Sequence, residues 1–317
     1  MEPILFEKAL NHFAAAARAY EKGRFKQAVS FCTKALNLGL DYPVIYFLRG
    51  DSYLSKKELA KAIADFTRAM ELNPNLPLVY FKRGYAHHES GDIYNAIADY
   101  TRYIEIFRNE PVSIPDAFFN RGLLYNEIKQ QDKAIKDFET VIKTKPKDPS
   151  PYYDMGLAYQ WKNMPGKAIS LYTKAILANP RYGYAYINRS CLYLKTKKYS
   201  KAFSDSCKAV RLTPEISDAY NNRGLGHYYR KRYKKAIADY NKAIKLDPKD
   251  SKPYYNRSLA FAALGDYKRA WQNVRKVIKL GADIDPAFLK DLCKYSGRNE
   301  LNAREHILTK EVSDGDG

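Results

Sequence analysis

The sequence predicts an all-α fold, a solenoid of eight tandem helix–turn–helix units, from three periodic features. Small residues recur at two fixed slots of a 34-residue period, aromatic residues recur at a third slot, and proline lies near the end of the period in five units. Such a period is typical of units made from two helices, which stack in a row because one unit cannot bury its apolar face alone. The clearest marker is alanine, which recurs at intervals of 34 residues with one interval of 38: Ala28, Ala62, Ala96, Ala134, Ala168, Ala202, Ala236 and Ala270.

The period supplies a common numbering for the units. When the first residue of each unit is position 1, the alanine is position 20, and the units begin at residues 9, 43, 77, 115, 149, 183, 217 and 251. Position 8 is small in all eight units, and position 4 is aromatic in seven. Small residues at positions 8 and 20 allow two helices to approach closely, while large residues at positions 4, 11 and 24 fill the space beside them.

The limits of the two helices in each unit follow from proline and glycine. Proline occupies position 1 in four units, where it suits the first turn of a helix, and position 32 in five units, where it ends the second helix. In three units Gly23, Gly91 and Gly265 mark the turn between the helices. Each unit is therefore expected to be a helical hairpin.

The units follow one another in two blocks. Residues 1–8 lead into the first helix, units 1 to 3 occupy residues 9–110, and units 4 to 8 occupy residues 115–284. Between the blocks, residues 111–114 are the four extra residues of the long interval, in a segment with two prolines and no strong helical pattern. We interpret this insert as a hinge or a break in register.

A further helix is expected after the last unit. Asp285 suits the N-cap of a helix and Pro286 suits its first turn, so residues 285–296 are predicted to form a capping helix. The remaining residues, 297–317, form a C-terminal extension that ends in a short polar tail, and we expect this extension to be partly disordered.

The segments YNNRGLGHYYRKRYKKAIADYNKAIKLDP at 220–248 and YYNRSLAFAALGDYKRA at 254–270 resemble the tetratricopeptide repeat (TPR) family, and the resemblance covers residues 9–284. The first unit departs from the pattern, with His12 at position 4 and Ala19 at position 11. The resemblance implies a right-handed superhelix whose first helices line a concave groove with positions 2, 5, 9, 12, 13, 33 and 34. It also implies a protein or peptide as partner.

Aromatic residues at the groove positions are candidate contacts for a bound peptide. Trp161 at position 13 is the best candidate for an exposed aromatic anchor. Position 5 carries an aromatic residue in four successive units, and together with position 9 these rings would form an apolar strip for peptide side chains. The alternative interpretation is that they pack between neighbouring units. The position-5 candidates are Phe47, Phe81, Phe119 and Tyr153.

Asparagine at position 6 suggests a second mode of peptide binding. This series, which we term the asparagine ladder, resembles the ladder of a peptide-binding TPR superhelix, where amides grip an extended backbone because they both donate and accept hydrogen bonds. Asp154 fills the slot in unit 5. The alternative is that the amides bond a neighbouring loop. The ladder consists of Asn120, Asn188, Asn222 and Asn256.

The sequence argues against one known class of TPR ligand. The carboxylate clamp of chaperone co-factors requires lysine at position 5 with asparagine at position 9, and no unit here has asparagine at position 9. Lys252 alone fits the clamp's lysine at position 2, and Asn256 follows it where arginine is needed. Heat-shock chaperone tails are therefore not expected partners.

Positive charge is concentrated in the last four units. The chain carries a formal net charge of +19, and residues 149–284 hold 27 Lys and Arg against 9 Asp and Glu. Twelve of these cations lie at positions 14 to 19, where only Asp266 opposes them. We term this edge the basic rim and expect it to attract an acidic protein, a nucleic acid or an anionic membrane surface, unless it only maintains solubility. Its residues are Lys162, Lys167, Lys197, Lys198, Lys201, Arg230, Lys231, Arg232, Lys234, Lys235, Lys268 and Arg269.

Catalytic chemistry has no recognisable basis in this sequence. The five histidines are scattered, the four cysteines lack paired or metal-type spacing, and no glycine-rich phosphate loop or nucleophile–base set is present. No segment resembles a transmembrane span or a signal peptide, so a cytoplasmic location is expected. The sequence thus predicts a non-enzymatic scaffold without cofactor or metal, which binds an extended or acidic protein partner. The alternative is a nucleic-acid binder, because residues 228–235 interleave tyrosines with cations.

Overall fold

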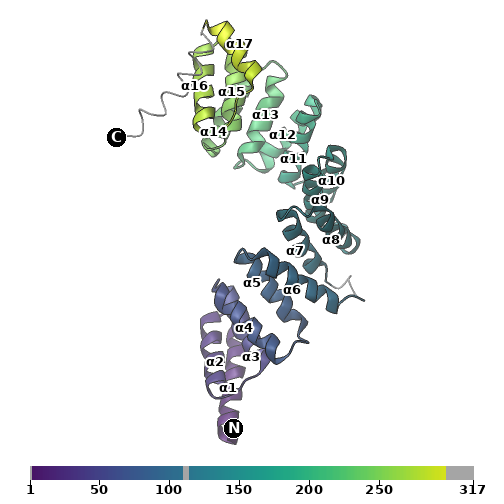
Figure 1. The fold of residues 1–317 in the computed structure, drawn as a ribbon, viewed down its shortest axis with the longest axis vertical. Coiled ribbons are helices and arrows are strands. Elements are labelled where there is room, and N and C mark those ends of the chain that lie inside the picture. The colour runs from purple at the N-terminus through teal and green to yellow at the C-terminus, as the bar shows by residue number, and fades with distance from the viewer. Residues whose placement is uncertain (1, 110–113, 298–317) are drawn as a thin grey trace, which may run out of the picture. The chain divides into compact units, whose positions relative to one another are not determined.

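The computed structural model describes residues 2–109 and 114–297, and within them it contains seventeen α-helices and no β-strand (Figure 1). The predicted all-α solenoid of eight helix pairs and a capping helix is confirmed. Two compact units divide the chain, an N-terminal half up to Asn163 and a C-terminal half from Met164. The helices of the N-terminal half are α1 (Pro3–Glu21), α2 (Phe25–Asn37), α3 (Pro43–Ser55), α4 (Leu59–Leu72), α5 (Pro77–Glu89), α6 (Ile93–Ile106), α7 (Pro115–Glu127), α8 (Gln131–Thr144) and α9 (Pro149–Trp161).

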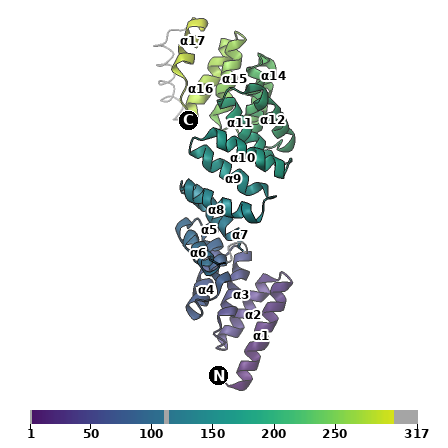
Figure 2. The same ribbon diagram turned by 90° about the vertical axis from the view of Figure 1, so that its right-hand side faces the viewer.

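The C-terminal half begins with the second helix of unit 5 and ends with the capping helix. Helices α11 to α16 form three successive hairpins, and α17 lies beside α16 at the end of the row (Figures 1 and 2). Its helices are α10 (Pro165–Ala178), α11 (Gly183–Lys195), α12 (Tyr199–Leu212), α13 (Ser217–Tyr228), α14 (Tyr233–Leu246), α15 (Ser251–Ala263), α16 (Tyr267–Lys279) and α17 (Pro286–Ser296).

Close packing between the helices of a pair explains the small residues at positions 8 and 20. The alanine at position 20 is fully buried in every unit. At position 8, a Cβ added to Gly224 would lie 2.5 Å from Cε1 of Tyr240, and one added to Gly122 would lie 2.7 Å from Cε1 of Phe138. The ring at position 24 therefore occupies the space that a side chain at position 8 would need.

The two positions vary together along the chain. Where position 24 is smaller than an aromatic ring, as at Cys32, Ser206 and Val274, position 8 carries a side chain instead of glycine: Ala16, Ser190 and Ser258. The residues at positions 8 and 24 thus share one packing volume between the two helices of a unit, and each unit fills this volume with its own combination of side chains.

The turn between the two helices adopts one conformation in all eight units. Position 15 has a positive φ throughout, between 55° and 81°, although only three units place glycine there. The following residue donates its N–H to the carbonyl of position 11, for example Arg232 to His227 at 3.0 Å, which closes the end of the first helix. The non-glycine residues at position 15 are Lys57, Lys129, Asn163, Lys197 and Lys231.

A buried ion pair links the helices of five units, and the sequence analysis did not foresee it. Arg189 at position 7 donates two hydrogen bonds to the carboxylate of Asp205 at position 23, at 2.7 and 2.8 Å, and a third to Thr173 of the preceding unit at 2.8 Å. Two oxygens face two N–H groups, so the geometry is bidentate. The same pair forms between Arg49 and Asp65, Arg83 and Asp99, Arg121 and Asp137, and Arg223 and Asp239.

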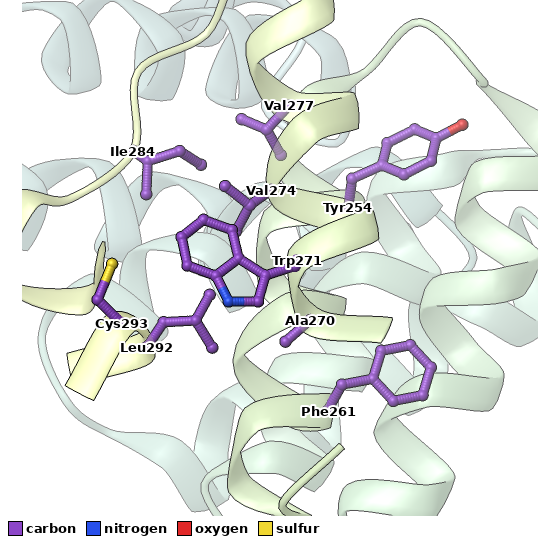
Figure 3. Packing of buried hydrophobic residues seen from close by; sticks show 9 residues of the cluster. All are labelled: Tyr254, Phe261, Ala270, Trp271, Val274, Val277, Ile284, Leu292 and Cys293. Atoms are coloured by element: carbon purple, nitrogen blue, oxygen red, sulfur yellow. The ribbon is translucent and has the colours of Figure 1, made fainter. Parts of the chain in front are cut away.

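The capping helix α17 begins as the sequence predicts. The carboxylate of Asp285 accepts a hydrogen bond from the N–H of Ala287 at 2.9 Å, and Pro286 is the first helical residue. Trp271 of α16 is 3% exposed, packs in a cluster with Leu292 and Cys293 of α17, and donates from Nε1 to Ser296 at 3.0 Å (Figure 3). The helix thereby covers the apolar face of unit 8.

Two predictions concern segments outside the described residues. The insert at 111–114 is described only at Ile114, and the extension at 297–317 only at Gly297, which has a φ of 67° and ends α17. Among the described helices, none combines the length and apolar character needed to cross a membrane.

Candidate functional site

The phenylalanines at position 5 are half-buried on the first helix of their units. Each packs against the ring at position 24 of its own unit: the ring centroids are 6.0 Å apart for Phe47 and Phe66, and 5.6 Å apart for Phe81 and Tyr100. Phe119 packs on Phe138 at 5.8 Å in the same way. These rings therefore contribute to the helix pair while keeping one part exposed.

An apolar pocket of about 190 Å³ lies beside Phe47, where α3 meets the start of α5. Its wall includes Val44 and Leu78, which both occupy position 2 and are 48% exposed. Leu76, Pro77 and Val79 complete the lining. Since the lining is apolar, the pocket suits an aliphatic or aromatic side chain.

Two further aromatic candidates lie on α9. The Trp161 side chain is 63% exposed at the end of the helix, where a bound chain could cover it. Tyr153, one of the position-5 candidates, is half-buried. The structure thus gives Trp161 the exposure that an anchor requires, and its role in binding stays a prediction.

A polar network that the sequence did not predict crosses the inner helices of units 1 to 3. The carboxylate of Asp51 is held by the Tyr20 hydroxyl and by the ammonium of Lys82, which lies 2.9 Å from Oδ1. Asp51 is 5% exposed. Burial and the nearby Asp51 raise the pKa of Tyr20 to about 12, so the hydroxyl stays a donor.

The asparagine ladder forms hydrogen bonds within the array. The amide nitrogen of Asn222 donates to the carbonyl of Ile187 at 3.2 Å, and that of Asn256 donates to Asn221 at 2.8 Å. Asn120 donates to the Tyr100 hydroxyl at 3.3 Å, while Asn188 is half-buried. For these three residues the partners lie within the array, on helices α11, α13 and α6 and not on a neighbouring loop. Peptide binding by the ladder stays a prediction, and it would require these amides to exchange partners.

Asp154 takes the ladder position in unit 5. Burial raises the pKa of its carboxyl to about 7, and the charge of Asp148 adds to the effect. Positions 7 and 23 of this unit are Met155 and Leu171, so unit 5 also lacks the arginine–aspartate pair of its neighbours. At neutral pH the group is therefore partly protonated, and like an amide it can donate as well as accept.

The basic rim of units 6 to 8 faces solvent. Lys197, Lys231 and most other rim residues are exposed, while Arg230 is half-buried with its guanidinium 3.9 Å from the centroid of the Phe203 ring. Arg269 pairs with Asp266, and within the described part of the chain the other nine rim residues of these units form no ion pair. The charge excess is thus available to a partner.

Tyrosines lie among the rim cations. Tyr199 and Tyr233 occupy position 17 of units 6 and 7, and Tyr199 stacks on Tyr229 with ring centroids 3.9 Å apart. Tyr229 is 47% exposed, whereas Tyr228 and Tyr233 are half-buried and pack against each other at 5.5 Å. The interleaved segment 228–235 therefore offers one largely open ring beside the cations.

Models of the tetratricopeptide repeat match more than half of this sequence. The chain belongs to the tetratricopeptide repeat family. Models described as tetratricopeptide repeat match residues 78–110, 183–216, 217–250 and 239–272, and a model described as TPR repeat matches residues 50–91 and 122–162. A comparison with curated proteins gives no match.

Solved TPR structures share the fold. The C-terminal part of a TPR repeat-containing protein from Cytophaga hutchinsonii aligns with a TM-score of 0.63 at 18% identity, over 77% of this chain and 98% of that one. A TPR protein from Parabacteroides merdae aligns with a TM-score of 0.56 at 19% identity, over 84% and 98%. A MamA protein aligns with a TM-score of 0.51 at 24% identity, over 55% and 93%.

Metal ligands and reactive thiols do not gather anywhere in the described part of this TPR array. Among these residues no group of three His, Cys, Asp or Glu side chains could hold a metal ion. Cys32 is buried at position 24, and burial raises the pKa of its thiol to about 12. This thiol packs as a small apolar group and is a poor nucleophile.

Proposed function

We propose that this TPR protein is a protein-interaction scaffold that binds an extended segment of a partner along its first helices. Family membership supports the general role, because TPR arrays stack to form long binding surfaces. The observation that carries the proposal is the exposure of large apolar side chains at groove positions, with Trp161 at 63% and Val44 and Leu78 at 48%. Exposed aromatic and aliphatic side chains of this kind anchor binding segments.

The basic rim adds a second element to the proposal. The exposed rim cations of units 6 to 8 attract an acidic partner and raise the rate of encounter, while the apolar contacts hold the bound segment. Rim and groove have different salt dependences, because exposed charges are screened by salt and apolar contacts are not. The partner is therefore expected to bind faster at low salt and to remain bound at moderate salt.

Charge reversal of one turn tests this proposal. The whole chain is immobilised, partners are captured, and the capture is repeated with Arg230, Lys231 and Arg232 changed to Glu. The matched control changes Lys22, Arg24 and Lys26 to Glu, since they are exposed cations of the corresponding turn in unit 1. A partner lost only from the first variant supports the rim, and a partner lost only with Trp161→Ala supports the groove. If every variant retains every partner, both surfaces are excluded.

Nucleic-acid binding is the second candidate function, and the stacked pair of Tyr199 and Tyr229 beside the rim cations favours it. An exposed ring can stack on a base while neighbouring cations contact phosphates. Titration of random-sequence single-stranded RNA and DNA at several salt concentrations distinguishes the two functions. A steep loss of affinity with rising salt supports nucleic-acid binding, and the absence of binding at low salt excludes it.

A further inference from the structure

A second pocket, of about 270 Å³, lies at the C-terminal end of the array between α15 and α17. Its walls come from groove positions 9, 12 and 13 of unit 8, from position 12 of unit 7, from Tyr267 at position 17 of unit 8 and from one face of the capping helix. The residues on α17 are spaced by three or four, so they project from the same side of the helix. The lining consists of Tyr228, Leu259, Ala262, Ala263, Tyr267, Phe288, Asp291, Leu292 and Tyr295.

Small residues of unit 8 open this pocket. Positions 12 and 13 are Ala262 and Ala263, whereas the preceding unit has Tyr228 and Tyr229 at the same positions. The large side chains that cover this part of unit 7 are therefore missing from unit 8. In their place the capping helix contributes Phe288, whose ring meets Tyr255 at 5.8 Å.

Two rings of the pocket are held parallel and apart. Tyr267 and Tyr295 lie with their planes 13° from parallel and their centroids 6.5 Å apart. The directly stacked pair of Tyr199 and Tyr229 has a centroid distance of 3.9 Å. The 6.5 Å separation of Tyr267 and Tyr295 is below twice the contact distance of ~3.5–4.0 Å, so a flat group does not fit between the two rings and can stack on one of them instead.

One carboxylate faces this aromatic site. Asp291 is exposed, lines the pocket one helical turn before Tyr295, and makes no hydrogen bond or ion pair with the described residues. Of the two lysines on α17, Lys290 directly precedes Asp291, and Lys294 lies over the Tyr295 ring at 5.6 Å from its centroid. The pocket thus offers aromatic faces and one unpaired negative charge.

We infer that this pocket receives an arginine side chain of the bound segment, with its guanidinium stacked on a tyrosine ring of the lining and paired with Asp291. The guanidinium is flat, always charged and weakly hydrated, so it stacks on aromatic faces and pairs with a carboxylate at the same time. An ammonium group lacks the flat shape, and an aliphatic side chain would leave the carboxylate without a partner. The inference rests on the proposed function, because part of the pocket wall comes from groove positions 9, 12 and 13.

Short peptides with a single central side chain test the inference on the full chain. The probe is a fluorescent Gly-Gly-Arg-Gly-Gly peptide, and its affinity is compared with versions that carry citrulline, lysine or leucine at the centre. Citrulline has nearly the same shape without the charge. We expect the arginine peptide to bind about five- to tenfold more tightly than the citrulline peptide, because one stacked and charge-assisted contact is lost.

Variants at the pocket locate the binding. Asp291→Asn is expected to reduce the affinity for the arginine peptide to that for citrulline, and Tyr295→Ala is expected to weaken it further. Asp283→Asn is the matched control, because Asp283 is also an exposed acid of the C-terminal half and does not line the pocket. Circular dichroism of each variant confirms that the helices are intact.

Three outcomes would overturn the inference: equal affinities for arginine and citrulline, tighter binding of leucine, or an Asp291→Asn variant that binds like the wild type. The peptide assay is independent of the partner-capture experiment. Loss of a captured partner on rim reversal or with Trp161→Ala, together with failure of the arginine peptide, would leave the proposed scaffold role standing and remove the pocket. Arginine binding without any captured partner would support the pocket and remove the proposed scaffold role.

Discussion

Two sets of cations in the array differ in burial and in pairing. The arginines at position 7 are half-buried, and in five units each one faces both oxygens of an aspartate across the helix pair. The rim cations of units 6 to 8 lie a few residues further along the same repeat, and among the described residues Arg269 is the one rim cation there with an ion pair. The first set thus joins helices, and the second set gives the surface its charge.

In unit 8 the arginine at position 7 has no carboxylate partner among the described residues. There Arg257 keeps its place, but its partners are the amides of Asn273 at 2.9 Å and Asn241 at 2.6 Å, so the geometry persists without a negative charge. Burial lowers the pKa of Arg257, whereas the carboxylate partner helps to raise the pKa of Arg49. The arginine at position 7 thus bonds to both neighbouring helices in unit 8 as well, and within the part of the chain that the structure describes the ion pair is present only where position 23 is an aspartate.

Breaking one interior pair should have the largest effect. Arg189→Met leaves the carboxylate of Asp205, which is 6% exposed, without its arginine, and we expect a loss of about 3–5 kcal/mol in the free energy of unfolding, measured with urea. The double variant Arg189→Met/Asp205→Leu reproduces the residue types of unit 5, Met155 and Leu171, and should recover most of the loss. A double variant as unstable as the single one would show that shape, not the stranded charge, is responsible.

Crowding the helix pair should have an intermediate effect. Gly224→Ala places a Cβ 2.5 Å from a ring carbon of the fully buried Tyr240, so we expect a loss of about 1–3 kcal/mol in the free energy of unfolding. In a Tyr240→Val background the same change should cost much less, because unit 8 already combines Ser258 with Val274. Thermal or urea unfolding of the four proteins measures this coupling, and equal costs in both backgrounds would contradict it.

Removing a strained rim cation should have the smallest effect and the opposite sign. Lys231 has a φ of 57°, so Lys231→Gly should raise the free energy of unfolding by about 0.5–1 kcal/mol. Lys242→Gly, an exposed position inside α14, is the control and should lower it by about 1 kcal/mol. A partner that is lost from the stabilised Lys231→Gly variant would be lost through charge alone. If Lys231→Gly and Lys242→Gly lowered the free energy of unfolding equally, the backbone of Lys231 would not be strained.

The helix pairs were predictable because they depend on local volume. Ala28, Gly50 and their counterparts recur with the period, and backbones can approach only where such residues lie. The pairing of Arg189 with Asp205 was also within reach, since arginine at position 7 and aspartate at position 23 recur 16 residues apart in most units. The spacing alone, however, does not show that these two side chains face each other across the helix pair.

Other features of the candidate site depend on rotamers and on neighbouring units. The sequence places Asn222 on the inner face, but it does not say that its amide faces Ile187 of the preceding unit. Likewise the sequence does not say that Ala262 and Ala263 line a pocket, because the opposite wall of that pocket comes from α17. The left-handed conformation of Lys197 could not be predicted from the lysine itself, because lysine rarely adopts it. The sequence signal for it is the glycine at the same position in other units, such as Gly23.

The joint variation of positions 8 and 24 has a consequence for how such a chain can grow or be engineered. Both members of each match lie in one helical hairpin, so a complete hairpin can be duplicated, deleted or transplanted without disturbing its internal fit. A crossover between positions 8 and 24 would join Ser190 to a large ring such as Tyr240, or Gly224 to Ser206, giving overlap in one product and a void in the other. Recombination between a unit with glycine at position 8 and a unit with serine there should therefore preserve the packing only when its breakpoints fall between hairpins.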